Sequence, residues 1–154
     1  MDTATRPYRS VLYIPGSKER ALEKARELPA DAIIFDLEDA VAPEAKAEAR
    51  ETLARALAEG GYGKRSRIVR INALTTEWGL EDVRVLGEAG ADAILLPKVN
   101  TPSDVDNLAD MLGPQVPIWV MMETPASVFN AREIAAHAQV TGLVTGTNDL
   151  TKDL

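Results

Sequence analysis

The chain has 154 residues, of which 45% are hydrophobic and 27% charged, and its formal net charge is −7. This length is enough for one domain with a substantial core, expected over residues 1–154. The negative charge argues against a nucleic-acid or anionic-membrane partner, and neither a membrane-spanning run nor a secretory signal is recognisable in the sequence.

Short apolar runs alternate with amphipathic stretches along the chain. The apolar runs predict buried parallel strands, and the amphipathic stretches predict helices between them. In chain order, the expected elements are strand 11–14, helix 18–28, strand 32–38, helix 43–58, strand 68–72, helix 76–89, strand 93–99, helix 103–112, strand 118–123, helix 126–136 and strand 142–146. Ser103, with Asp106 three residues later, is expected to cap the fourth of these helices.

This alternation predicts an α/β fold with a parallel sheet and right-handed crossovers. Two architectures fit it: a doubly wound sheet, or a (β/α)₈ TIM barrel truncated after its sixth strand. A whole barrel needs about 250 residues, and the chain stops just past the sixth strand, which favours the first six units of a barrel. The segments 29–34 (PADAII) and 90–95 (GADAIL) look alike. The similarity reflects either a faint internal repeat or a helix-to-strand junction that any βα protein reuses.

The metal-ligating residue types are restricted. Cysteine is absent, which excludes disulfides and thiolate metal sites and fits a cytoplasmic location, and His137 is the only histidine. A metal site would therefore use oxygen ligands, as Mg²⁺, Mn²⁺ and Ca²⁺ prefer. Glu123 and Asp149 follow consecutive expected strands and are the best candidates. The alternative is that each of them caps the helix that follows it.

Arg70 lies inside an apolar strand, where a buried guanidinium needs a carboxylate partner. The expected partner is Glu38, Asp39 or a bound ligand, and a purely structural Arg–Glu pair is the alternative. The loop at residues 14–20 (IPGSKER) could offer backbone N–H groups and Lys18 to a phosphate, although it lacks the P-loop pattern.

Several segments carry a family resemblance. They are RSVLYIPGSKERALEKA, IIFDLEDAVAPEAKAEAR, VRIN, ILLPKV, METP and GTNDLTKDL. In this order and spacing the chain resembles the citrate lyase β-subunit and malyl-CoA lyase branch of the HpcH/HpaI aldolase superfamily. The resemblance implies a (β/α)₈ barrel that binds Mg²⁺, with Mn²⁺ as the alternative ion, at its C-terminal rim. It also implies a homo-oligomer, usually a trimer or hexamer.

The resemblance assigns roles to individual residues. Glu123 and Asp149 match the metal ligands, and Arg70 matches the arginine that contacts the reacting oxyanion or carboxylate. Glu38 and Asp39 match an acidic pair that supports the arginine and the metal-bound waters. The positions that match CoA contacts are Tyr13, Lys18 and Lys24, with Lys18 standing where relatives often hold arginine.

The implied activity is Mg²⁺-dependent cleavage, or condensation, at a carbon–carbon bond of a malyl-, citramalyl- or citryl-type CoA thioester, yielding an acyl-CoA and an oxo-acid. The alternatives are a CoA-independent class II aldolase acting on a 2-oxo acid, and a non-catalytic truncated subunit. The family's last two βα units and C-terminal segment have no counterpart here, and in relatives that segment supplies a catalytic aspartate and a lid to a neighbouring subunit. Weak activity at best is therefore expected from this chain alone. Lys98 is assigned no role.

Overall fold

The computed structural model describes residues 7–154, so the first six residues of the expected domain lie outside the described part. Residues 7–154 form one six-stranded sheet in which every neighbouring pair of strands is parallel. The strands are β1 (Val11–Pro15), β2 (Ala32–Asp36), β3 (Ser66–Arg70), β4 (Ala93–Leu96), β5 (Ile118–Met122) and β6 (Val140–Thr145). All six expected strands are confirmed, with ends that differ by a few residues.

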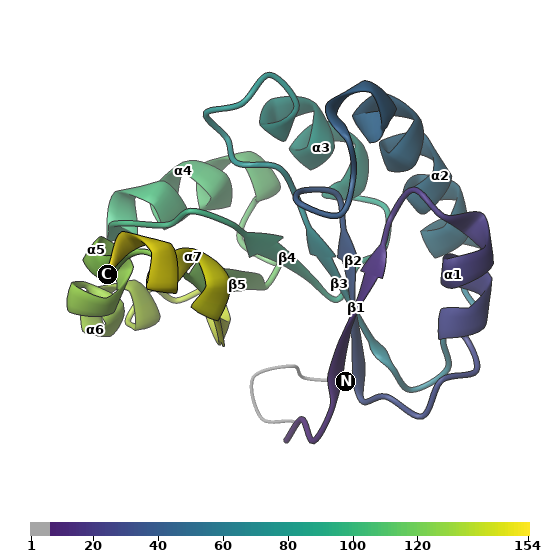
Figure 1. Cartoon of the computed structure of the whole chain (residues 1–154), viewed down its shortest axis with the longest axis horizontal. Helices are drawn as coiled ribbons and strands as arrows, with labels where there is room; N and C mark the ends of the chain where they lie inside the picture. Colours follow the sequence, from purple (N-terminus) through teal and green to yellow (C-terminus); the bar gives the residue numbers. More distant parts are fainter. Residues whose placement is uncertain (1–6) are drawn as a thin grey trace.

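The helices follow the strands in turn. They are α1 (Glu19–Ala25), α2 (Lys46–Glu59) after a short 3₁₀ turn (Pro43–Ala45), α3 (Gly79–Leu86), α4 (Pro102–Leu112), α5 (Pro125–Phe129), α6 (Ala131–Ala135) and α7 (Thr147–Asp153). Figure 1 shows α1 to α4 succeeding one another around one side of a curled sheet.

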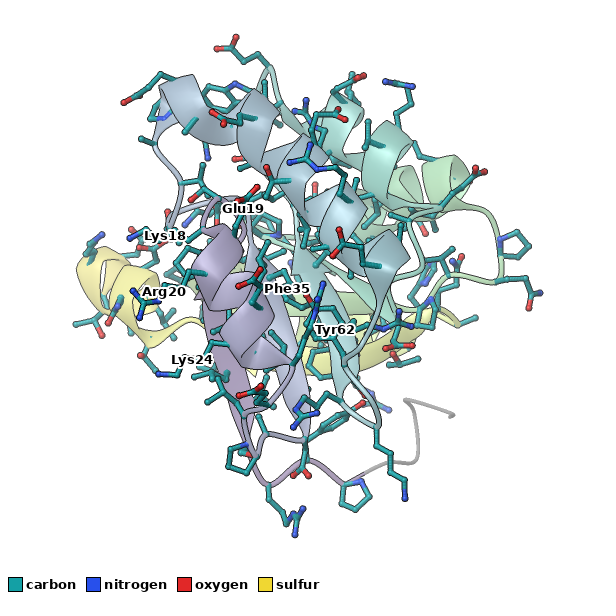
Figure 2. The ribbon with its side chains drawn as sticks, turned by 90° about the vertical axis from the view of Figure 1, so that its right-hand side faces the viewer. Lys18, Glu19, Arg20, Lys24, Phe35 and Tyr62 are labelled. Atoms are coloured by element: carbon teal, nitrogen blue, oxygen red, sulfur yellow. The ribbon has the colours of Figure 1, made fainter. Side chains whose placement is uncertain are left out.

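The strand order in space equals the order in sequence, β1 to β6. In a doubly wound sheet the strand order reverses at a switch point, and helices cover both faces. The doubly wound alternative is therefore wrong. The strands curl into a half-barrel instead. The larger apolar core lies between the sheet and its helices and includes Ile33, Phe35, Leu53 and Leu108. Figure 2 shows Phe35 and Tyr62 beside α1, and their rings meet edge to face with centroids 5.2 Å apart.

The concave face of the half-barrel has an apolar lower tier. It is a second cluster formed by Ile34, Ile68, Ala93, Leu95, Trp119 and Met121. Residues two apart on a strand share a face, so the next position along β2 on this side is Asp36 and along β3 is Arg70. The polar residues at the C-terminal ends of the strands therefore lie next to this apolar cluster on the same face of the sheet.

Two helix predictions are corrected in detail. The cap of α4 is Thr101, not Ser103, and its partner three residues on is Asp104, whose carboxylate accepts from the Thr101 N–H at 2.9 Å. The single helix expected over residues 126–136 is divided into α5 and α6 at Asn130. The side chain of Asn130 donates to the Asn100 carbonyl at 2.8 Å, a contact between distant segments that fixes this break.

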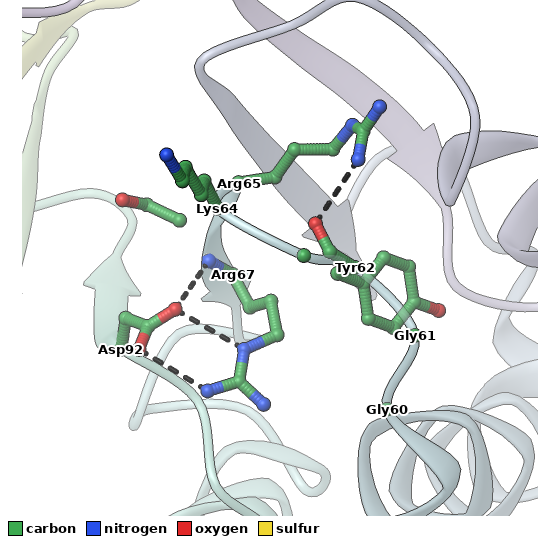
Figure 3. Close-up of a pocket in the computed structure, with 9 residues that line it drawn as sticks. Gly60, Gly61, Tyr62, Lys64, Arg65, Arg67 and Asp92 are labelled. Atoms are coloured by element: carbon green, nitrogen blue, oxygen red, sulfur yellow. Dashed lines mark hydrogen bonds and ion pairs between the residues drawn. The ribbon is translucent and has the colours of Figure 1, made fainter.

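The similar segments 29–34 and 90–95 make the same contact at the N-terminal ends of the strands. Asp31 accepts from the Arg9 main-chain N–H at 2.7 Å and from its guanidinium at 3.1 and 2.8 Å. Asp92 accepts from the Arg67 N–H at 2.7 Å and from its guanidinium at 3.1 and 3.2 Å (Figure 3). Each aspartate thus ties the beginning of one strand to the loop before the next.

Candidate functional site

Polar side chains from four strands meet at the C-terminal end of the half-barrel, where parallel α/β folds build their active sites. They border an open cavity of about 450 Å³. Its lining includes Tyr13, Asp36, Asp39, Arg70, Met121, Glu123, Gly146 and Asp149. The structure therefore brings several of the residues predicted from the strand ends together around one cavity.

Arg70 is held mainly by a residue that the sequence prediction missed. Asp36 accepts hydrogen bonds from Arg70 Nε at 2.7 Å and Nη2 at 2.6 Å, and both side chains are buried. The expected partners are also present, with Glu38 Oε2 at 2.9 Å and Asp39 Oδ2 at 3.6 Å from Nη1. The prediction is corrected in one respect: the main partner of Arg70 is Asp36, which lies opposite it on the neighbouring strand. Their hydrogen bonds raise the pKa of Arg70 against the opposing effect of burial, so the guanidinium stays charged.

Asp36 also shapes the loop that carries the acidic pair. Its two carboxylate oxygens accept from the main-chain N–H groups of Glu38 at 2.9 Å and Ala40 at 3.1 Å. One buried carboxylate therefore fixes both the arginine and the loop that bears Glu38 and Asp39.

Glu38 is a largely buried carboxyl group with an unusual pKa. Its pKa is raised to about 7, chiefly by burial against the lowering effect of Arg70, and the nearby charges of Asp39 and Glu123 contribute to the rise. Its Oε2 lies beside Arg70 without the alignment of a hydrogen bond. A carboxyl group with this pKa can accept or release a proton near neutral pH.

Tyr13 stands beside Arg70 on the concave face. The Arg70 guanidinium carbon lies 5.2 Å from the centre of the Tyr13 ring, within the range of a cation–π contact, and the hydroxyl donates to Met121 Sδ at 3.3 Å. The structure brings Tyr13 to the rim site itself. Lys18 is the N-cap residue of α1 and lies on the same rim, whereas Lys24 lies in the last turn of α1, farther from the rim (Figure 2).

Glu123 and Asp149 converge on one cationic group. Lys98 Nζ contacts Asp149 Oδ2 and lies 3.6 Å from Glu123 Oε1. The Lys98 main-chain N–H also donates to Glu123 Oε1 at 2.7 Å. The hydrogen bond from Lys98, followed by that from Lys152, lowers the pKa of Asp149. The two acids thus point at a shared position that already attracts positive charge.

Neither acid is a helix cap, so that alternative is wrong. The cap of α5 is Thr124, which accepts from the Ser127 N–H at 3.1 Å, and Asp149 lies inside α7, whose N-cap position is Gly146. Gly146 has a steric role instead. A Cβ at this position would lie 2.6 Å from Glu123 Cβ and 2.8 Å from its Oε2. Only glycine lets the loop after β6 come this close to Glu123.

The donor set fits a hard divalent cation. Two carboxylates face the position of the Lys98 ammonium, and residues 7–154 contain no cluster of three acid, histidine or cysteine side chains for a metal. Mg²⁺ is commonly bound through one or two carboxylates and otherwise by water and substrate. Carboxylates also outnumber cations around the cavity, so an added divalent cation would relieve repulsion between them.

A buried polar network behind the rim was not predicted. The Lys46 ammonium donates to the carbonyls of Leu37 and Glu38, both at 2.8 Å, and to Asn72 Oδ1 at 2.6 Å. Asp82 in turn accepts from the Asn72 main-chain and side-chain N–H groups at 2.8 and 2.7 Å. This network fixes the main chain where β2 ends and so supports the acidic loop.

No helix within residues 7–154 combines the length and apolar character needed to cross a membrane.

Comparison with family models matches residues 9–154 to the model described as HpcH/HpaI aldolase/citrate lyase. The chain is 59% identical over 148 residues to a (3S)-malyl-CoA thioesterase of Cereibacter sphaeroides (strain ATCC 17025 / ATH 2.4.3), a match that covers 96% of this chain and 52% of the relative.

Two further relatives also match nearly all of this chain over about half of their own length. The citrate lyase subunit beta of Escherichia coli (strain K12) is 34% identical over 161 residues, covering 97% of this chain and 53% of its own. A crystal structure of CitE from Mycobacterium tuberculosis, in complex with magnesium, acetoacetate and coenzyme A, superposes with a TM-score of 0.77 at 31% identity and covers 93% of this chain and 50% of that one. The chain spans about half the length of the curated relatives it matches.

Proposed function

Because the chain belongs to the HpcH/HpaI aldolase/citrate lyase family, we propose that it acts on a malyl-CoA-type thioester at a Mg²⁺ centre held by Glu123 and Asp149. The proposed reaction is cleavage, or formation, of the carbon–carbon bond between an oxo-acid and an acyl-CoA. The observation that carries the proposal is the convergence of these two carboxylates on one cation position, next to the buried Arg70. Mn²⁺ could replace Mg²⁺ at such a site.

The residues divide the chemistry between them. When bound, Mg²⁺ supplies a Lewis acid that polarises substrate oxygen atoms. Arg70 is fixed by Asp36 and borders the cavity, so its charge can stabilise the negative charge that develops on the substrate. Glu38 can accept the proton of the substrate hydroxyl because burial raises its pKa to about 7. Asp39, which is exposed, adds negative charge beside the arginine.

The substrate's CoA portion is assigned to the first βα unit. Lys18 and Lys24 are exposed cations on this unit, and such groups suit the phosphates of CoA. Tyr13, on the preceding strand, borders the cavity and would contact the acyl end. The proposal also includes a (β/α)₈ architecture, of which residues 1–154 supply the first six units, a homo-oligomer such as a trimer or hexamer, and a cytoplasmic location.

A second candidate reaction is hydrolysis of the thioester bond. The 59% identity to a (3S)-malyl-CoA thioesterase favours it. In this route Glu38 would accept a proton from water instead of from the substrate hydroxyl. The two reactions share a substrate and differ in the bond that breaks, so their products distinguish them.

The test is a product assay with (3S)-malyl-CoA, Mg²⁺ and the 154-residue chain, with EDTA as the metal-free control. Glyoxylate without a free thiol supports carbon–carbon cleavage, and free CoA thiol without glyoxylate supports hydrolysis. Release of pyruvate from a 4-hydroxy-2-oxo acid, with no reaction of the thioester, would favour the CoA-independent aldolase. Binding of Mn²⁺ and CoA without any product would favour a non-catalytic subunit.

A further inference from the structure

Lys98 has the most unusual main chain of the rim. Its φ of 55° is the only positive value at a non-glycine position within residues 7–154. A side chain in this left-handed region is strained, and such strain persists at functional sites when surrounding contacts enforce it. The enforcing contact is the hydrogen bond of 2.7 Å from the Lys98 N–H to Glu123 Oε1.

This conformation lets one residue reach the proposed metal ligands in two ways. The main-chain N–H orients Glu123, while the ammonium group lies 3.6 Å from Glu123 Oε1 and contacts Asp149 Oδ2. Lys152 also reaches Asp149, at 3.2 Å from its other oxygen, but Glu123 is not among its ion-pair partners. Lys98 is thus the cation that the two carboxylates share.

We propose that Lys98 is a built-in competitor for the divalent cation: its ammonium holds Glu123 and Asp149 together in the metal-free protein, and metal binding displaces it. The inference rests on the proposed metal centre. A divalent ion bound by the same oxygens would repel the ammonium at close range. The Lys98 side chain is 39% exposed, so it has a path into solvent. Its main-chain N–H can keep orienting Glu123 after the side chain has moved.

The competitor role predicts tighter metal binding when the ammonium is removed. Lys98→Met keeps a similar chain length and the main-chain N–H but loses the charge. We expect its affinity for Mn²⁺ to rise on the order of threefold to tenfold, as fits loss of one partly exposed ion-pair arrangement. Affinity is measured by isothermal titration calorimetry and by the electron paramagnetic resonance signal of free Mn²⁺, and neither method requires turnover.

Lys152→Met is the matched control because it removes the same charge from the other oxygen of Asp149. Its Mn²⁺ affinity should rise less than that of Lys98→Met. Equal rises in both variants would mean that Lys98 acts only through its general charge. An unchanged or weaker Mn²⁺ affinity in Lys98→Met would mean that Lys98 supports metal binding. Either result overturns the proposal. Circular dichroism and thermal unfolding verify that each variant is folded.

Two further variants separate this proposal from the proposed function. Glu123→Gln in the otherwise unchanged chain should abolish Mn²⁺ binding if the metal centre is correct. Mn²⁺ binding that depends on Glu123 but is unaffected by Lys98→Met overturns the competitor role alone. Absence of Mn²⁺ binding in the unchanged chain and also in Lys98→Met overturns the metal centre and the competitor role together. Absence in the first with binding in the second supports both.

Discussion

Asp36 and Arg70 end neighbouring parallel strands at the same register position and are joined by two hydrogen bonds, of 2.7 and 2.6 Å. Both side chains are buried, so removing Asp36 takes two hydrogen bonds from a buried charge and leaves it only the contacts of Nη1 with Glu38 and Asp39. Asp36→Ala should therefore lower the free energy of unfolding by about 3 kcal/mol or more, as measured by urea denaturation. Arg84→Ala removes only an exposed pair with Glu81 and should leave the urea midpoint unchanged. Similar midpoints for the two variants would show that the buried pair is not structurally important.

Glu38 should make stability depend on pH. Its pKa is raised from 4.5 to about 7, so the native state holds a proton that the unfolded chain has already released. The free energy of unfolding should fall as the pH rises between these two values and then level off. Glu38→Gln cannot ionise and should remove this loss, giving a gain of at most about 3 kcal/mol above pH 7. Urea titrations at pH 5 and pH 8 would test it, and an equal effect of the substitution at both values would contradict the assignment.

Metal binding should raise the melting temperature. Saturation at a hundredfold excess over Kd adds about 2.7 kcal/mol, which for a domain of this size corresponds to a rise of roughly 5–10 °C. Asp149→Asn should abolish the Mg²⁺-dependent rise because it removes one of the two proposed ligands. Asp153→Asn is the matched control on the same helix and should retain it. A full Mg²⁺ response in Asp149→Asn would place the metal elsewhere.

Lys46 should be a stability residue whose loss also disturbs the rim. Lys46→Met leaves two main-chain carbonyls and Asn72 Oδ1 without their donor in a buried setting. We expect a loss of about 2 kcal/mol or more in the free energy of unfolding, although burial already lowers the pKa of this lysine and opposes its charge. Lys24→Met, at an exposed position, should have little effect. An unchanged urea midpoint in Lys46→Met would show that water replaces the ammonium.

The assignment of Lys18 to CoA predicts a selective kinetic effect. Lys18→Ala should raise KM for the CoA thioester severalfold and leave kcat nearly unchanged, because it removes binding that ground state and transition state share. The effect should shrink as salt is added. Lys64→Ala is the control, since Lys64 lies in the loop at the opposite ends of the strands (Figure 3). A fall in kcat without a change in KM would assign Lys18 to the chemistry instead.

The fold could be predicted from the sequence because the residues of β2 to β5 are almost all buried. Runs such as 93–99 show apolar character without alternation, which is the pattern of a parallel sheet covered on both faces. The ends of the helices were harder to predict from the sequence. Thr101 and Ser103 are both plausible caps, and only the position of Asp104 decides between them. The break at Asn130 depends on a contact with Asn100, which no local pattern contains.

The candidate site was predicted in its residue types but not in its connections. Asp36 and Arg70 each lie two positions before the end of successive expected strands, so their pairing could have been found by aligning those ends. Lys46 could also have been found, because it lies three and seven positions before Ala49 and Leu53 on the buried stripe of one helix. Lys98 could not, since its role depends on a left-handed main chain that the surrounding Leu-Pro-Lys-Val does not indicate.

On the concave face, β2, β3 and β5 each carry an apolar residue below a polar one. Ile34 lies below Asp36, Ile68 below Arg70, and Met121 below Glu123 on the same side. A designer who wished to change the reaction could exchange the upper members as a set and leave the lower ones untouched. Asp36 and Arg70 would have to be exchanged together, because either one alone would leave a buried partner without its two hydrogen bonds.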